Sequence, residues 1–248
     1  MKEILYYIID PTFSALHREA INYIKKDKNL VVFDVGCYRG VFFKKVLKQT
    51  KCTEKNSRFY IFDINKNVKK YIHTFLKLKI FFYNEIALSD KSGKAKYNYN
   101  RFFESSGSSL SPIVKNDSKW VLSRKIILKL FFQSTKGFIK YEVPTITLDS
   151  FVKKKKIKFI SILKIDVEGS EEKVLNGAKK NLKKNKIKII LVEILERKNF
   201  HKKKEKQIIT FLKKYNFELI KKRIALSTSC FSNIKGGDYL FVNKSFKY

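Results

Sequence analysis

Short apolar runs alternate with amphipathic segments along most of this chain, and this rhythm is typical of α/β proteins with a parallel sheet. The apolar runs are rich in Val, Ile and Phe and predict buried strands, namely residues 30–35, 58–63, 80–87, 159–165 and 187–194. Segments with apolar residues at helical spacing predict helices, namely residues 14–26, 41–49, 68–77, 171–182 and 202–215. We therefore expect a doubly wound α/β fold, with helices on both faces of a mainly parallel sheet.

Two regions depart from this rhythm and predict antiparallel pairing. Residues 217–226 and 238–242 are strands with no helical segment between them, so the sheet is expected to finish in an antiparallel hairpin. Residues 94–99 alternate polar and apolar side chains after a turn-rich stretch and predict a short edge hairpin. Pro144, inside the strand predicted over 141–148, indicates an edge strand because proline cannot donate to a sheet ladder.

The domain organisation follows from length and composition. A chain of 248 residues that is 44% hydrophobic can build one sizeable core. We predict a helical extension over residues 1–29 and one α/β domain over residues 30–248. Residues 100–140 begin with a serine-rich stretch and interrupt the strand–helix order, so they form either a lid over a substrate site or a surface excursion.

The end of the first predicted strand carries the first candidate site. There a buried acid, Asp34, is followed by a turn between Gly36 and Gly40, and a second acid, Asp63, ends the next strand. A dinucleotide-binding loop needs a middle glycine that admits a pyrophosphate, and Cys37 stands in its place. S-adenosylmethionine fits better, since its cationic amino-acid end suits Asp34 and its ribose suits Asp63. An ordinary glycine turn with no ligand stays open as the alternative.

A second group of acids follows the later strands. Asp166 and Glu168 come directly after the fourth strand, and Glu193 lies near the end of the fifth. Three roles are open for them: accepting a proton from a substrate hydroxyl, holding a divalent cation, or orienting a ligand. In the alternative reading Asp166 only caps the next helix and Glu168 is only solvated.

Histidines and cysteines add little chemistry. His17 and His73 lie on amphipathic segments and are expected at the surface, whereas His201 opens a helix close enough to reach the crevice. The cysteines form no C-x-x-C pair and no zinc pattern, so we expect reduced thiols at Cys37, Cys52 and Cys230.

The formal net charge of +33 raises the question of an anionic partner. Only seven of the 55 basic residues are arginine, although bidentate contacts to phosphates favour arginine, and the lysines are spread over every segment. We favour solvated helix faces, with peripheral attraction to an anionic glycan or lipid surface, or binding to RNA or DNA, as the alternatives. No apolar run is long enough to span a bilayer and the first residues do not resemble a signal peptide, so a cytoplasmic protein is expected.

Motifs from residue 30 to residue 194 are arranged in one characteristic order. They are Asp34-Val35-Gly36-x-x-x-Gly40, Phe62-Asp63, Ala87-Leu88-Ser89-Asp90, Ser108-Ser109-Leu110, Thr147-Leu148-Asp149, Leu163-Lys164-Ile165-Asp166-Val167-Glu168-Gly169-Ser170-Glu171 and Val174-Leu175-Asn176-Gly177-Ala178. In this order and spacing they resemble the FkbM family of S-adenosylmethionine-dependent methyltransferases. The resemblance implies a Rossmann-like class I methyltransferase fold with a seven-stranded sheet. It also implies O-methyl transfer to a hydroxyl, often of a sugar in a glycan, glycolipid or related metabolite.

The resemblance also implies roles for individual residues. The methionine end of the cofactor would lie against Asp34 and the Gly36–Gly40 loop, including Cys37 and Tyr38, with the ribose and adenine against Asp63, Ile64, Ala87 and Asp90. Two departures from the family pattern concern this set. Cys37 and Tyr38 replace a small residue and an asparagine of the loop, and Asp63 is followed by Ile64 where the family commonly has a Glu-Pro pair.

On this basis Asp166 is expected to deprotonate the acceptor hydroxyl, assisted by Glu168 or by a bound cation. A divalent cation, if one is used, would be held by Asp166 and Glu193; no other metal site is predicted. The acceptor is expected to be a small molecule or a glycan, and the sequence predicts no oligomeric state. The alternatives are a nucleic-acid methyltransferase, disfavoured because no N/D-P-P-Y/F loop follows the fourth strand, and a non-catalytic protein that binds an anionic polymer.

Overall fold

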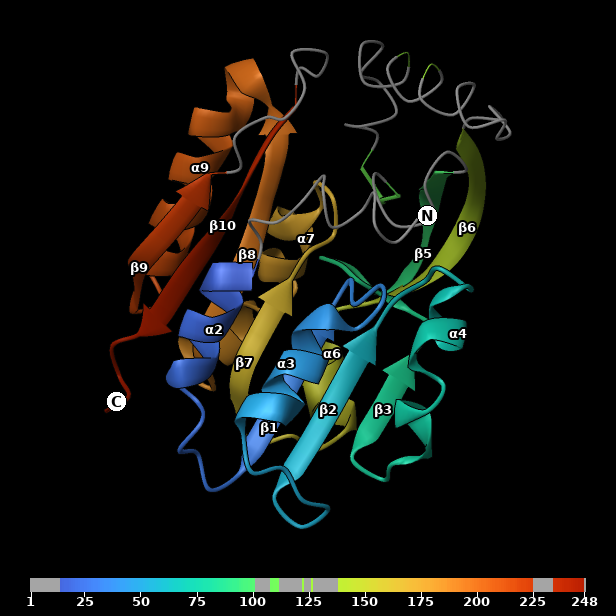
Figure 1. Ribbon diagram of the computed structural model, residues 1–248. Helices are drawn as coiled ribbons and strands as arrows, with labels where there is room; N and C mark the ends of the chain where they lie inside the picture. The colour runs from blue at the N-terminus through green and yellow to red at the C-terminus, as the bar shows by residue number, and fades with distance from the viewer. Residues whose placement is uncertain are drawn as a thin grey trace.

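The computed structural model describes residues 14–100, 108–111, 122, 126, 138–224 and 234–247. Its centre is a seven-stranded sheet with the order β3-β2-β1-β7-β8-β10-β9 (Figure 1). In chain order these strands are β1 (Leu30–Val35), β2 (Ser57–Phe62), β3 (Phe81–Asn84), β7 (Ile160–Ile165), β8 (Ile187–Arg197), β9 (Phe217–Ile224) and β10 (Ile234–Asn243). Five neighbouring strands of this sheet, β3, β2, β1, β7 and β8, run parallel, and β10 is antiparallel to both β8 and β9. The predicted α/β class, the mainly parallel seven-stranded sheet and its antiparallel C-terminal pair are confirmed.

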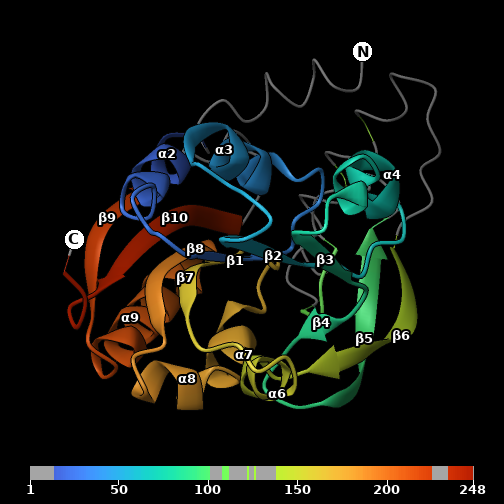
Figure 2. The same cartoon turned by 90° about the horizontal axis from the view of Figure 1, so that it is seen from below.

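Helices cover both faces of this sheet, as its side-chain alternation requires. On β1, Phe33 and Val35 join one apolar layer and Val32 joins the other. The Val32 layer is covered by α2 (Ser14–Asn22), α3 (Val41–Gln49) and α4 (Val68–Ile72). The Phe33 layer is covered by α6 (Leu148–Lys154), α7 (Glu171–Asn176), α8 (Lys179–Lys183) and α9 (Lys198–Lys213). Figure 2 shows the two sets of helices on opposite sides of the sheet.

A second, three-stranded sheet lies beside β3 and has the order β4-β6-β5 (Figure 2). Its strands are β4 (Ala87–Leu88), β5 (Gly93–Asn100) and β6 (Phe138–Ile146). The strand predicted over 80–87 is therefore divided between two sheets. The edge position predicted for Pro144 is wrong at the level of the strand, because β6 is central. Proline is tolerated there because β4 pairs only with Thr145 and Ile146, so Pro144 has a ladder partner on the β5 side alone.

Two predicted helices are also divided. The helix expected over 171–182 is broken into α7 and α8 at Gly177, where an added Cβ would overlap the carbonyl oxygen of Ser89. The chain thus packs too closely against the segment after β4 for a side chain at this position. The helix expected over 68–77 ends as α4 at Ile72 and is followed by the short 3₁₀ helix η1 (Phe75–Lys77).

Parts of two predictions lie outside the described residues. The first is the region 100–140, predicted to form either a lid or a surface excursion, most of which is not described. Of the extension over 1–29, helix α2 is described, and it packs in the same apolar layer as α3. Along the described ranges, every helix is too short or too polar to cross a bilayer.

Candidate active site

The carboxyl ends of β1, β2, β7 and β8 meet at one edge of the large sheet (Figure 1). The winding reverses between β1 and β7, since β2 lies on one side of β1 and β7 on the other. Doubly wound proteins bind ligands just outside such a reversal. Asp63 directly follows β2, Asp166 directly follows β7, and Glu193 lies in the second half of β8. The fold therefore brings the two groups of acids predicted from sequence to a common edge.

The loop after β1 is in direct contact with the segment after β7. Gly36 has a φ of 76°, and an added Cβ would overlap the carbonyl oxygen of Asp166. The Asp166 amide donates to the carbonyl of Val35 at 2.9 Å, which continues the β1–β7 ladder. At the other end of the loop Gly40 has a φ of 70°, and a Cβ there would overlap the ring of Phe43. Both glycines are thus required by the packing of the protein itself.

Asp63 organises the opposite side of this loop. Its two carboxylate oxygens accept hydrogen bonds from the backbone amides of Tyr38 and Asn65, each at 2.9 Å. The hydroxyl of Tyr83 donates to the Asp63 carbonyl at 2.9 Å. Burial raises the pKa of the Asp63 carboxyl to about 6, although the two amide hydrogen bonds oppose this. Each oxygen keeps acceptor capacity, so the carboxylate can still accept hydrogen bonds from a ligand.

Lys164, which the sequence prediction did not single out, connects Asp34 to Asp166. Its ammonium group lies 3.3 Å from Asp34 Oδ1 and 3.1 Å from Asp166 Oδ2, and it donates to the Gly36 carbonyl at 2.7 Å. Burial disfavours the charged lysine, but the carboxylates of Asp166 and Asp34 outweigh it and raise the pKa of Lys164. Asp34 is fully buried, and this burial raises its pKa. A lysine inside the apolar strand Ile160–Ile165 was the sequence signal for this cluster.

Asp166 and Glu193 are neighbours across β7 and β8 and share a hydrogen bond. Burial, together with the charges of Asp166 and Glu168, raises the pKa of Glu193 well above its usual value. Burial also acts to raise the pKa of Asp166, but Lys164 and the hydrogen bond from Glu193 lower it overall. Burial and the neighbouring charges thus favour the protonated form of Glu193, whereas Lys164 and the hydrogen bond from Glu193 favour the ionised form of Asp166. Asp238 lies opposite Glu193 in the register of the neighbouring strand β10.

Metal binding receives no support from this cluster. No group of three or more His, Cys, Asp or Glu side chains in the described part of the chain is placed to hold a metal ion. A metal role for Asp166 and Glu193 stays a prediction.

The loop that carries Glu168 is held by a second buried lysine. Glu168 and Gly169 have positive φ values of 54° and 104°. Glu171, fully buried, accepts from the Gly169 amide at 2.6 Å and from Lys204 at 2.8 Å. Lys204 also donates to the carbonyls of Gly169 and Leu195 at 3.1 and 2.9 Å. Nothing in the lysine run 202–206 distinguished this one buried member from its solvated neighbours.

Serine residues of the quoted motifs support the same loop. The Ser109 hydroxyl donates to the carbonyl of Val167 at 2.9 Å and lies 3.3 Å from the Ser170 hydroxyl. Ser170 precedes α7, but its side chain makes no capping hydrogen bond. The Ser108-Ser109-Leu110 motif therefore anchors the loop after β7 through Ser109.

The remaining residues of the predicted cofactor set differ in exposure. Cys37 is buried and lies 4.0 Å from Asp63 Oδ2, and burial raises the pKa of its thiol. Tyr38 is half-buried with a φ of 45°. Ile64 and Ala87 are half-buried as well, and Asp90 is exposed and accepts from the Ser89 hydroxyl. Their contact with a cofactor stays a prediction.

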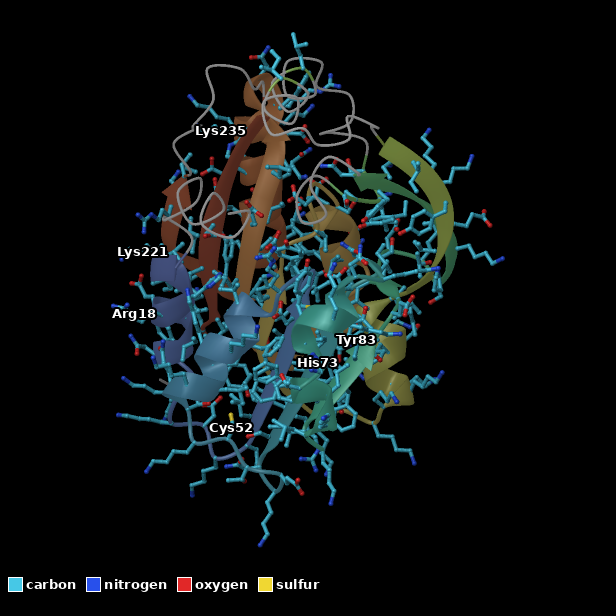
Figure 3. All side chains as sticks on the ribbon, turned by 45° about the vertical axis from the view of Figure 1, so that its right-hand side comes forward. Arg18, Cys52, His73, Tyr83, Lys221 and Lys235 are labelled. Carbon is cyan, nitrogen blue, oxygen red and sulfur yellow. The ribbon has the colours of Figure 1, made fainter. Side chains whose placement is uncertain are left out.

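The histidine predictions meet different outcomes. His73 is exposed on the surface, as expected (labelled in Figure 3). The surface position expected for His17 is wrong, because α2 buries it against the ring of Phe42 at a centroid distance of 5.3 Å. Burial, followed by the charge of Lys164, lowers the pKa of His17 to about 3. His201 is fully buried between α9 and the sheet, so it is not available to a ligand at the crevice.

Basic side chains project from many parts of the surface. Figure 3 shows Arg18 on α2, Lys221 on β9 and Lys235 on β10, and long side chains extend from the other layers as well. Some are paired, such as Lys221 with Glu19 at 2.9 Å. The described basic residues are thus distributed over the fold and are not confined to one face.

Known proteins place this site in context. The sequence matches the family model of the methyltransferase FkbM domain over residues 34–219. No curated protein sequence matches the chain. The solved structures that resemble it include methyltransferase FkbM from Methylobacillus flagellatus KT, with a TM-score of 0.47 and 10% identity over 86% of this chain. The chain spans 44% of that protein's length.

Two further structures cover nearly the whole of each chain. An rRNA methylase from Streptococcus thermophilus has a TM-score of 0.47 and 10% identity, covering 92% of this chain and 93% of its own. An N-methyltransferase from Bradyrhizobium japonicum WM9 has a TM-score of 0.45 and 8% identity, covering 93% and 97%.

Proposed function

This chain belongs to the FkbM methyltransferase family, and from that premise we propose that it transfers a methyl group from S-adenosylmethionine to a hydroxyl group. We propose a sugar of a glycan, a glycolipid or a related metabolite as the acceptor. The observation that supports the proposal most is the contact between the Gly36 loop and Asp166, because it puts the cofactor loop beside an ionised acid. Cys37 and Cys52, the cysteines in the described part of the chain, are free thiols, which is typical of a reducing compartment, and we infer a cytoplasmic location.

The residues at this edge suit the parts of S-adenosylmethionine. Asp63 would accept hydrogen bonds from the ribose hydroxyls, because it lies half-exposed at the end of β2 and keeps acceptor capacity. Ile64, Ala87 and Asp90 would surround the adenine. Gly36, Cys37, Tyr38 and Gly40 would meet the methionine end through the backbone of their loop. Asp34 is fully buried and paired with Lys164, so it would act on that end through its charge and not by direct contact.

Asp166 would act on the acceptor. When bound, S-adenosylmethionine supplies a methyl group already activated by a positively charged sulfur. The remaining task is to align a hydroxyl oxygen with that methyl group and to receive the hydroxyl proton. Asp166 is suited to this because Lys164 keeps it ionised and its side chain is 35% exposed. Glu168, half-buried on the same loop, would help to orient the acceptor.

Binding and transfer can be tested separately. We expect calorimetry to show saturable binding of S-adenosylmethionine and of its demethylated product. Incubation with methyl-labelled S-adenosylmethionine and extracts of the source cells should then label a carbohydrate or glycolipid fraction. Absence of binding at millimolar ligand would refute the cofactor assignment.

An RNA acceptor is the second candidate, favoured by the formal net charge of +33. Label recovered in the nucleic-acid fraction, and lost after ribonuclease treatment, would select RNA over a sugar. Transfer to RNA should also weaken steeply with added salt, whereas transfer to a neutral sugar should not.

A further inference from the structure

Lys164 is the one charged residue of β7, a strand that is wholly buried. Every position of β7 is buried, and the Lys164 side chain is 8% exposed. An isolated ammonium group in such a place is destabilised by several kcal/mol, so its retention requires close partners. It has three, namely the carbonyl of Gly36, the carboxylate of Asp34 and the carboxylate of Asp166.

These partners belong to different parts of the site. Gly36 lies in the loop assigned to the cofactor, whereas Asp166 is assigned to the acceptor. Asp34, on β1, is fully buried, while Asp166 is about one-third exposed at the edge of the sheet. We propose that Lys164 is a positioning residue, which ties the cofactor loop to the acceptor-side acid and fixes the Asp166 carboxylate in its reactive orientation.

The surroundings of Asp166 make this role specific to Lys164. Four charged or titratable groups from four elements interact with Asp166, namely Asp34 on β1, Lys164 on β7, Glu193 on β8 and His17 on α2. A fifth, Glu168 on the loop of Asp166, acts on Glu193. His17 is neutral near pH 7 because its pKa is lowered to about 3. Among these five groups Lys164 is therefore the cation. Removing it takes the cation out of this group of five and leaves Asp166 with Asp34, Glu168 and Glu193.

The first test measures the titration of Asp166 in the ligand-free protein. Carbon-13 NMR of protein labelled at the aspartate carboxyl carbons would follow it, with Asp166→Asn used only to assign the signal. In Lys164→Met the Asp166 midpoint should rise by about one to three pH units, because the opposite charge is lost. A midpoint equal to that of the wild type would overturn the proposal.

Lys188→Met is the matched control. Lys188 is also a buried lysine on a central strand, and it pairs with Asp27 at 2.6 Å, away from the site. The control should lose stability as Lys164→Met does, yet leave the Asp166 midpoint at its wild-type value. An equal rise in both variants would mean that general loosening moves the midpoint, which contradicts a specific role for Lys164.

Lys164→Arg decides the question if the methionine variant does not fold. Arginine keeps the charge but replaces the compact ammonium group by a broad planar group. The Asp166 midpoint should then stay low. The kcat should fall at least about tenfold, because the Gly36 carbonyl and the Asp166 carboxylate are no longer held together. Unchanged kcat would overturn the positioning role.

The kinetic arm rests on the proposed function. In Lys164→Met the acid limb of the kcat/KM profile should move to higher pH by the same amount as the NMR midpoint, with a smaller effect on the KM for S-adenosylmethionine. A limb that stays in place while the midpoint moves would contradict the proposal. If the wild type neither binds S-adenosylmethionine nor transfers methyl groups, the proposed function fails, whereas the NMR titration still decides the role of Lys164.

Discussion

Two buried lysines serve the segment after β7, and they do so in different ways. Lys204 reaches in from α9 and donates to the fully buried Glu171 and to two carbonyls, and the partly exposed Glu196 lies 4.0 Å away. Lys164 rises from β7 itself and contacts one carbonyl and two carboxylates, of which Asp166 is partly open to solvent. We call the first network closed, because the acid that Lys204 hydrogen-bonds is fully buried. We call the second open, because it ends in the partly exposed carboxylate of Asp166.

The two networks differ in what they support, since one holds a backbone conformation and the other holds a carboxylate that can meet a ligand. The closed network fixes the backbone of Glu168 and Gly169, both of which have positive φ. The open network leaves an ionised oxygen directed to the edge where a ligand would bind. A buried ion pair by itself is weak evidence for stability or for function, so what matters is whether one member can reach beyond the protein.

The largest expected effect concerns the open network. Asp166→Asn keeps the size of the side chain but cannot accept a proton, so turnover should fall by about 10²–10⁴-fold. The affinity for S-adenosylmethionine should remain within a few fold, as measured by calorimetry. Glu54→Gln, at an exposed position distant from the site, is the control for turnover. Wild-type turnover in Asp166→Asn would remove Asp166 from the mechanism.

Breaking the closed network should mainly reduce stability. Lys204→Met leaves Glu171 buried without its cation, and the free energy of unfolding in urea should fall by about 3–5 kcal/mol. Lys203→Met, the exposed neighbour on the same helix, should change it by no more than about 0.5 kcal/mol. The double variant Glu171→Met with Lys204→Met should recover part of the loss. Equal stabilities for the two single lysine variants would show that the closed network contributes nothing.

A smaller effect is expected on the cofactor side. Asp63→Asn retains an acceptor oxygen but loses the charge, so S-adenosylmethionine should bind about 10–100-fold more weakly, equivalent to about 1.5–3 kcal/mol. Calorimetry would measure this, with the exposed Glu142→Gln as control. Asp63 forms no hydrogen bond or ion pair with either lysine and feels Lys164 only at longer range, so its substitution should move the Asp166 midpoint far less than Lys164→Met does. Unaltered affinity would mean that Asp63 only supports the Tyr38 loop.

At neutral pH the smallest effect concerns the helix that covers the open network, because the contribution of His17 develops only as the pH is lowered. His17 has a pKa of about 3 in the folded chain, below its ordinary value of 6.5, so the unfolded chain binds more protons between these values. Stability should therefore fall as the pH is lowered from 6.5 toward 3, and His17→Phe should show a weaker fall. Asp63, with its raised pKa of about 6, acts in the opposite direction below pH 6 but equally in both proteins. His73→Gln, an exposed histidine, is the control, and identical slopes for wild type and His17→Phe would contradict the prediction.

Much of the site was predictable because its acids end apolar strands. Apolar runs locate strands, and parallel strands place their carboxyl ends together, so Asp63, Asp166 and Glu193 could be assigned to one edge from the sequence. Their states could not be assigned in the same way. The low pKa of Asp166 and the raised pKa of Glu193 depend on Lys164 and on each other, across two neighbouring strands.

The sequence by itself determined the order of strands and helices and the antiparallel end of the sheet, since both follow from local periodicity. The tertiary structure alone decided which lysines are buried, where the helix breaks at Gly177, and how the small sheet forms. Lys164 meets Gly36 across 128 positions, and Lys204 meets Glu171 across 33. A sequence does not distinguish a solvated lysine from an enclosed one, because its distant neighbours in the fold decide whether it is buried and whether it stays charged.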